Sequence, residues 1–207
     1  MTMKEKSQKL KILAASDLHE DRKAVERLAE KAEKENVDLV IICGDITYFD
    51  NEWRGMIGPF LKRGKEVLFV PGNHESIATT AVLTEKYDIK NLQQYSISIG
   101  DIGIFGCGGA NVGPNIMSER DIHDYLKRNF RYVKTAKKKV MITHMHPANS
   151  LVEKMSFPGS KAVRKAIDDF QPDVHIFGHI HETEGLEEEF GKTKSICVGK
   201  HGKIISV

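Results

Sequence analysis

Short apolar runs rich in Val and Ile alternate with amphipathic segments along this chain. Runs of this kind predict strands, and the longer ones read as strands buried on both faces, as in the interior of an α/β domain. The expected strands lie at residues 10–15, 38–43, 66–70, 95–99, 102–106, 139–143, 173–177, 186–190, 194–198 and 203–207.

Two of the intervening segments carry apolar residues at helical spacing. Residues 21–35 place Asp21 in the first turn of a predicted helix, where an acidic group is favourable. Residues 159–170 repeat the apolar pattern, and Pro172 marks the end of that helix. Weaker helical patterns occupy residues 52–63 and 118–130.

The order of these elements predicts one α/β domain over residues 1–207, with two mixed sheets packed together between helices. The last third is expected to form antiparallel hairpins, with a turn in EEFGKTKS. The glycine-rich residues 105–115 predict a long loop of the kind that is often functional. They are no dinucleotide fingerprint, because Asn111 stands where the third glycine would be.

Charge and cysteine content exclude several classes of function. The 31 basic and 29 acidic residues are well mixed, so the net charge of +2 gives no strong field for nucleic acid or a membrane surface. The three cysteines are widely spaced and lack a C-x-x-C pair, which argues against disulfides and thiolate metal sites. The charged start MTMKEKSQKLK has no signal-peptide core, and no segment approaches the ~18 apolar residues of a membrane span. We therefore expect a cytoplasmic protein.

Polar side chains follow five of the predicted strands. Taken singly, each motif is typical of a turn. Because the carboxyl ends of strands in an α/β sheet open into one crevice, their joint occurrence predicts a single pocket. The residues concerned are Asp17 and His19, Asp45, Asn73 with His74 and Glu75, His144, and finally His179 and His181.

This set of ligands combines nitrogen and oxygen without sulfur. Such a set suits divalent Mn, Fe, Co, Ni or Zn better than Ca or Mg, which prefer oxygen alone. It holds too many groups for one ion that must keep a position open for water or substrate. Two metal ions are therefore expected.

The ordered motifs D-x-H, G-D, G-N-H-E, H and G-H-x-H resemble those of the calcineurin-like metallophosphoesterase superfamily. GDITYF, GCGGAN and GHIHE look most like the bacterial and archaeal branch related to cyclic-nucleotide phosphodiesterases. The resemblance implies the metallo-dependent phosphatase fold, a four-layer α/β/β/α sandwich. It departs from the G-D-x-x-D motif at Tyr48, which replaces the second acidic residue.

The resemblance also implies a role for each motif residue. One ion would be held by Asp17, His19 and His181, the other by Asn73, His144 and His179, with Asp45 bridging both. His74 would be the catalytic histidine and Glu75 would orient it. The implied reaction is hydrolysis of phosphomonoesters or phosphodiesters by a metal-bridging hydroxide.

Further side chains are weaker candidates. Tyr48 and His146 are expected to contact substrate, and Glu182 is expected to brace a metal ligand. Satisfied structural roles are the simpler interpretation of His123, His175 and His201.

Two other functions compete with hydrolysis of a small phosphate ester. A metal-binding scaffold of the same fold typically lacks the catalytic histidine, so retention of His74 argues against it. A nuclease is disfavoured by the near-neutral charge and by the lack of a basic, aromatic-lined groove. The physiological substrate, the native metals and the oligomeric state stay open, a homo-oligomer being one option.

Overall fold

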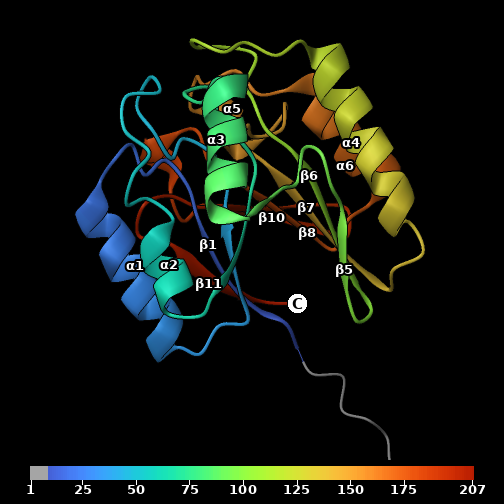
Figure 1. The fold of residues 1–207 in the computed structure, drawn as a ribbon. Helices are drawn as coiled ribbons and strands as arrows, with labels where there is room; N and C mark the ends of the chain where they lie inside the picture. Colours follow the sequence, from blue (N-terminus) through green and yellow to red (C-terminus); the bar gives the residue numbers. More distant parts are fainter. Residues whose placement is uncertain (1–8) are drawn as a thin grey trace, which may run out of the picture.

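A computed structural model describes residues 9–207, so most of the charged start of the chain lies outside the described residues. The strands form a five-stranded and a six-stranded sheet, in the orders β11-β1-β2-β3-β4 and β5-β6-β7-β8-β10-β9 (Figure 1). The first sheet contains β1 (Lys11–Ala15), β2 (Leu39–Ile42), β3 (Glu66–Phe69), β4 (Lys90–Asn91) and β11 (Lys203–Ser206). The second contains β5 (Ile97–Ile99), β6 (Ile102–Cys107), β7 (Lys138–Thr143), β8 (Val174–Phe177), β9 (Glu187–Phe190) and β10 (Thr193–Cys197).

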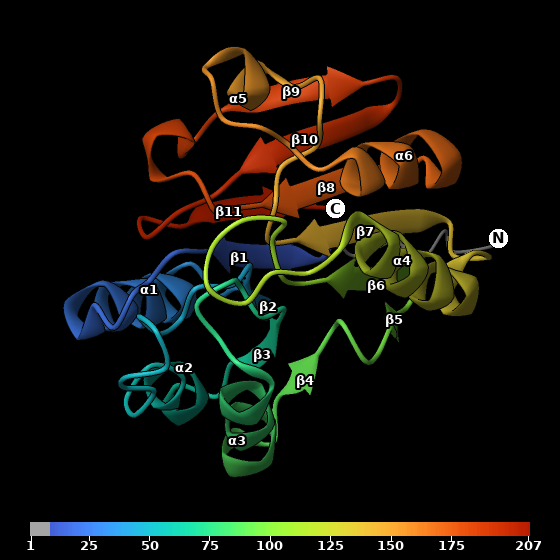
Figure 2. The ribbon, with the colours of Figure 1, turned by 90° about the horizontal axis from the view of Figure 1, so that it is seen from above.

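Helices cover the outer face of each sheet, which gives the four layers (Figure 2). On the first sheet lie α1 (Arg22–Lys34), α2 (Gly58–Lys62) and α3 (Ile77–Tyr87). On the second lie α4 (Glu119–Val133) and α6 (Lys161–Phe170), and the short α5 (Leu151–Lys154) and the 3₁₀ turn η1 (His181–Thr183) lie in connections. The predicted α/β/β/α sandwich is confirmed.

The strand β1 shows why its residues are apolar on both faces. Leu13 and Ala15 pack beneath the helices of the first sheet, whereas Ile12 and Ala14 pack against the second sheet. Alternate side chains of a strand point to opposite faces, so a strand between two layers needs apolar residues at every position. The core between the sheets brings the carboxyl ends of β1, β2, β3, β7 and β8 toward one another.

Several local predictions were wrong. No helix was expected at α3, because only Leu83, Thr79 and Thr80 turn inward and Ile77 is exposed, so no apolar stripe marks it. The predicted helix at 52–63 is reduced to α2, and the loop expected at 105–115 begins only after β6 ends at Cys107.

The C-terminal strands also differ from expectation. The hairpin of β9 and β10 is antiparallel as predicted, but β10 pairs in parallel with β8. The last strand, β11, leaves this sheet and pairs antiparallel with β1 in the other. Within residues 9–207, no helix has the length and apolar character needed to cross a membrane.

His175 links three strands of the second sheet from a fully buried position. Its Nε2 lies 2.8 Å from the hydroxyl of Thr143 and its Nδ1 lies 2.8 Å from that of Ser195. Burial, with a smaller contribution from His146, lowers the pKa of His175 from 6.5 to about 3. The structural role predicted for this histidine is confirmed.

This low pKa predicts a loss of stability in acid. Between the ordinary pKa of 6.5 and the folded value of about 3, the unfolded chain binds a proton at His175 that the folded protein does not. The free energy of unfolding should therefore fall as the pH is lowered through this window. From pH 7 to pH 5 the wild type should lose ~2 kcal/mol more than His175→Gln, measured by urea unfolding. Equal losses in the two proteins would contradict the assignment.

Candidate metal centre

The loops after five strands meet at one end of the sandwich. Within the first sheet, the N–H of Asp17 donates to the carbonyl of Gly44 at 3.1 Å. Within the second, the N–H of Gly178 donates to the carbonyl of His144 at 3.0 Å. The two sheets are joined where Nδ1 of His144 lies 2.7 Å from the carbonyl oxygen of Cys43. All seven expected ligands are carried by these loops.

Three overlapping clusters of nitrogen and oxygen atoms could each hold a cation, and one of them joins His74 to the expected ligands His19 and Asp45. The other two clusters contain six of the expected ligands. Asp17, His19 and His181 make the first, and Asp45, His144 and His179 make the second, with the ligand atoms of each within 4.8 Å of one another. The seventh ligand, Asn73, adjoins the second cluster, because its Oδ1 lies 3.1 Å from Nε2 of His144.

Asp45 belongs to the second cluster and also adjoins the first. Its Oδ2 is 3.7 Å from Nε2 of His19 in the first cluster and 3.4 Å from Nε2 of His144 in the second. Its Oδ1 accepts a hydrogen bond from the N–H of His74 at 3.0 Å. This is the position that a carboxylate shared by two ions would occupy.

The polar atoms of the clusters fit divalent cations. Oδ1 of Asp17 is buried and has no hydrogen-bond partner among the described residues, although buried polar atoms are normally paired. Nε2 of His19 faces Nε2 of His181 at 3.1 Å, and Nδ1 of His179 faces Nε2 of His144 at 3.2 Å. Ring nitrogens that face one another in this way can share a metal ion.

The protonation of the second cluster follows from burial and charge. Burial and the neighbouring His144 lower the pKa of His179 to about 3, so His179 keeps the lone pair that a metal ligand requires. Burial opposes charge at both partners of the Asp45–His144 pair, but their mutual attraction prevails. It lowers the pKa of Asp45 and raises that of His144 to about 9. A cation in the cluster would replace the proton on His144.

The backbone at the site adopts conformations that are rare outside glycine. Positive φ angles occur at Asp17 (56°), His19 (41°), Asp45 (52°) and His179 (77°). Such conformations cluster at functional sites, where the surrounding structure holds them. At Gly178 a Cβ would lie 2.0 Å from Oγ of Ser16, so this position admits only glycine.

His74 is held by two exposed aromatic residues. The N–H of Phe49 donates to Nδ1 of His74 at 3.3 Å, and Nε2 lies 3.9 Å from Oδ2 of Asp45. The ring of Tyr48 stacks on His74 with centroids 5.1 Å apart, and that of Phe49 meets it edge-on at 4.5 Å. Tyr48 is thus close to the centre, as expected. Phe49 was not predicted as part of the site, and no pattern in the sequence indicates its φ of 53°.

Glu75 does not contact the ring of His74 in the described structure, contrary to expectation. It is buried and accepts hydrogen bonds from the N–H groups of Gly72, Asp45 and Thr47 at 2.8, 3.0 and 2.7 Å. Burial and the charge of Asp45 raise the pKa of Glu75 to about 7. Glu75 therefore braces the backbone that carries Asp45.

The two weaker candidates, His146 and Glu182, are not placed for the roles expected of them. His146 is fully buried, and its Nε2 lies 2.9 Å from the carbonyl oxygen of Phe157, so it offers no surface to a substrate. Glu182 is exposed and forms no hydrogen bond to another described residue. Its expected bracing of a ligand is not seen.

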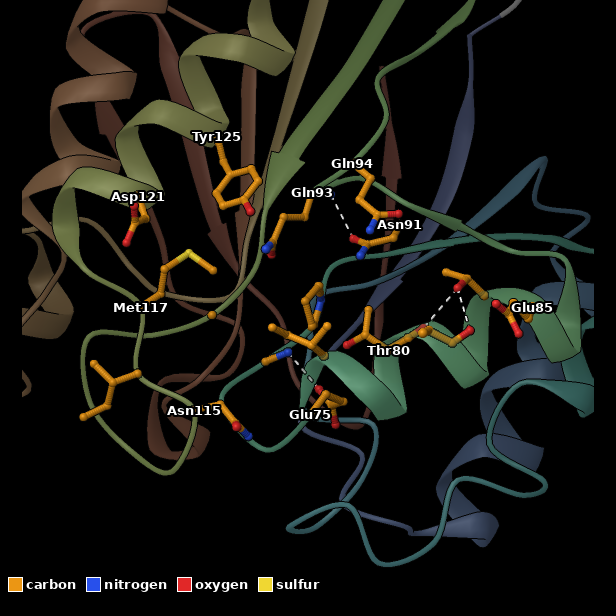
Figure 3. Close-up of a pocket in the computed structure, with 17 residues that line it drawn as sticks. Glu75, Thr80, Glu85, Asn91, Gln93, Gln94, Asn115, Met117, Asp121 and Tyr125 are labelled. Atoms are coloured by element: carbon orange, nitrogen blue, oxygen red, sulfur yellow. Dashed lines mark hydrogen bonds between the residues drawn. The ribbon is translucent and has the colours of Figure 1, made fainter.

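A cavity of about 640 Å³ lies beside the loop that carries Asn73 and His74 (Figure 3). Gly72 and Glu75 line it from that loop, and Asn115 lines it from the glycine-rich segment. The backbone and side-chain amides of Asn115 donate to the carbonyl of Asn73 at 3.1 and 2.9 Å. The glycine-rich segment thus packs on a ligand loop, which gives it the proximity to the site that its length suggested.

The carboxylate of Asp45 occupies the space where a side chain at position 72 would lie. A Cβ there would lie 1.9 Å from Oδ1 of Asp45, so Gly72→Ala should displace the shared carboxylate. We expect Mn²⁺ affinity to fall by at least about tenfold, measured by equilibrium dialysis with elemental analysis, while the protein stays folded. Gly58→Ala is the control, since the nearest atom to its Cβ would be 3.9 Å away. Wild-type affinity in Gly72→Ala would contradict the central place of Asp45.

Comparisons with known proteins identify the fold and the family of the chain. The chain resembles TT1561 of Thermus thermophilus (TM-score 0.77, 16% identity, 97% of this chain and 99% of that one). It also resembles a dimetal phosphatase from Danio rerio (TM-score 0.64, 12% identity, 93% and 88%), and these likenesses show the fold. The uncharacterized protein MJ1162 of Methanocaldococcus jannaschii is 30% identical over 196 residues, covering 86% of this chain and 84% of the relative. The family model described as calcineurin-like phosphoesterase matches residues 10–183, and the chain therefore belongs to that family.

Proposed function

We propose that this protein is a phosphoester hydrolase that uses two divalent metal ions. The observation that carries the proposal is the position of Asp45 between two clusters of candidate ligands, since a shared carboxylate is what a pair of ions requires. When bound, the two ions supply an activated water for attack on phosphorus and neutralise charge on the phosphoryl oxygens.

The chain divides the ligands between its two sheets. Asp17 and His19 follow β1 of the first sheet, and His181 reaches them from the loop after β8 of the second. His144 and His179 follow β7 and β8, and Asn73 reaches them from the loop after β3. We assign the first three to one ion, the second three to the other, and Asp45 to both. The mixed nitrogen and oxygen set favours Mn, Fe, Ni or Zn.

His74 is the proposed proton donor. Because Nδ1 accepts the N–H of Phe49, the proton of the neutral ring belongs on Nε2. Nε2 is the atom turned toward Asp45 and the space between the clusters. From there the neutral ring can donate a hydrogen bond to the oxygen that leaves phosphorus, and it can transfer a proton to that oxygen only when Nδ1 is protonated as well. Packing of Tyr48 and Phe49 against the ring fixes this orientation.

We also propose the cytoplasmic location that the sequence predicts.

The proposed substrate is a small phosphate ester. We expect protein loaded with Mn²⁺ or Ni²⁺ to cleave p-nitrophenyl phosphate or bis(p-nitrophenyl) phosphate. Asp45→Asn and His74→Ala should each lower kcat/KM by about 100-fold or more. Asp45→Asn disrupts the binding of the two metal ions, and His74→Ala removes the group that donates to the leaving oxygen. Assays with Mn, Ni, Zn and Mg on both esters measure this and decide between monoester and diester.

Metal content distinguishes the two variants. Asp45→Asn should lose bound metal, whereas His74→Ala should retain it, since His74 is not among the seven proposed ligands. His123→Ala is the control, because its ring lies on α4 and pairs with Asp169 away from the centre. Undiminished turnover in Asp45→Asn would overturn the two-metal assignment. Wild-type protein that binds two metals yet cleaves no ester in a broad panel would instead favour a non-catalytic scaffold.

A further inference from the structure

A second cavity, of about 390 Å³, opens beside the first metal cluster and shares no lining residue with the cavity of Figure 3. Three of the residues that line it are the candidate ligands of that cluster, Asp17, His19 and His181. The opposite wall belongs to neither the proposed ligand set nor the proposed proton donor, and is made by Glu184, Lys200 and His201.

This opposite wall is fixed by a dense set of hydrogen bonds. Glu184, which ends the turn begun by His181, accepts the N–H of His201 at 2.9 Å and lies 2.8 Å from its Nδ1. The ammonium of Lys31 donates to the carbonyls of His201 and Gly202 at 3.3 and 2.7 Å. Nε2 of His201 is thereby left for a ligand. The satisfied structural role expected of His201 accounts for its Nδ1, which lies beside Glu184, but not for its Nε2.

Some charged groups that line this cavity are already engaged by other residues, whereas one is not. The carboxylate of Glu184 is engaged by His201, and that of Asp21 caps α1 by accepting the N–H of Ala24 at 2.9 Å. Lys200 is exposed, and no ion pair includes it among residues 9–207. Asp17 also lines the cavity but belongs to the first metal cluster, so among residues 9–207 Lys200 is the lining charge that no ion pair, helix end or candidate metal cluster engages.

The cavity of Figure 3 has the opposite character. Glu85, Asp121 and several carboxamides line it, and none of its lining residues is a lysine, arginine or histidine. An anionic group attached to a bound phosphate would be repelled there. The two cavities that flank the ligand loops thus discriminate between the groups a phosphoester can carry.

We propose that the 390 Å³ cavity is a subsite for a second anionic group of the substrate, a carboxylate or a further phosphate, bound by Lys200 and by Nε2 of His201. The inference rests on the proposed function, because it places the scissile phosphate at the adjacent metal clusters. Glu184 acts as a positioning residue for His201. The substrate class becomes a phosphoester with a distal negative charge.

Binding of two phosphonates that resist hydrolysis tests the subsite without turnover. Propylphosphonate carries only the phosphonate, and 3-phosphonopropionate adds a carboxylate at the far end of a similar chain. Calorimetry on Mn²⁺-loaded wild-type protein should show about tenfold tighter binding of 3-phosphonopropionate. Lys200→Gln should abolish this preference, Lys200→Arg should keep it, and His201→Ala should reduce it by about threefold. Glu184→Gln should weaken 3-phosphonopropionate alone.

The control is Lys192→Gln, which removes an equally exposed lysine from the turn between β9 and β10 and should leave the preference intact. Equal affinity of the wild type for both phosphonates would overturn the subsite and leave the hydrolase proposal standing. A preference that persists in Lys200→Gln and His201→Ala would overturn it as well, since the carboxylate would then be bound elsewhere. Failure of the wild type to bind either phosphonate would overturn the proposed function and the subsite together.

Discussion

The structure depends above all on holding the carboxylate of Asp45 between imidazoles that come from both sides of the centre. Two hydrogen bonds and the space beside one glycine fix its position. Oδ1 accepts the N–H of His74, Glu75 accepts the N–H of Asp45 itself, and Gly72 leaves room for the carboxylate that any side chain would fill. Without these contacts a buried carboxylate would be costly, because its charge is removed from water. The GNHE motif therefore serves to fix Asp45 as much as to supply Asn73 and His74.

This arrangement explains why two sheets are needed. A single sheet could bring Asp17, Asp45 and Asn73 to one edge, but His144 and His179 follow strands of the other sheet. The apolar core between the sheets sets their separation, and the contact of His144 with the carbonyl of Cys43 joins them at the site. A cavity opened in that core would shift one half of the ligands relative to the other. Packing far from the chemistry thus controls the distance between the clusters.

The sequence predicted the parts of this design that are local. Apolar runs identify strands because burial on two faces demands it, and a polar residue directly after such a run must lie at the sheet edge. Features that depend on contacts between distant parts of the chain were not predicted. The apolar pattern of β11 would be the same whether the strand paired with β10 or with β1. The carboxylate of Glu75 accepts hydrogen bonds from backbone N–H groups, and no pattern of side chains predicts where those groups lie. The helix α3 was not predicted because Thr79 and Thr80 occupy its buried face, which therefore shows no apolar stripe in the sequence.

Strain at the site is the reason why the rest of the fold must be rigid. Left-handed backbone conformations at non-glycine residues each cost on the order of 1 kcal/mol or more, and Asp17, Asp45 and His179 all adopt them. No candidate metal ligand can be exchanged for glycine without losing its donor atoms, so the surrounding structure has to offset that cost. The core between the sheets, with Ile12, Ile41 and Ile142 fully buried, provides the required stabilisation. The sandwich therefore stabilises a strained array of ligands that would relax apart in a looser fold.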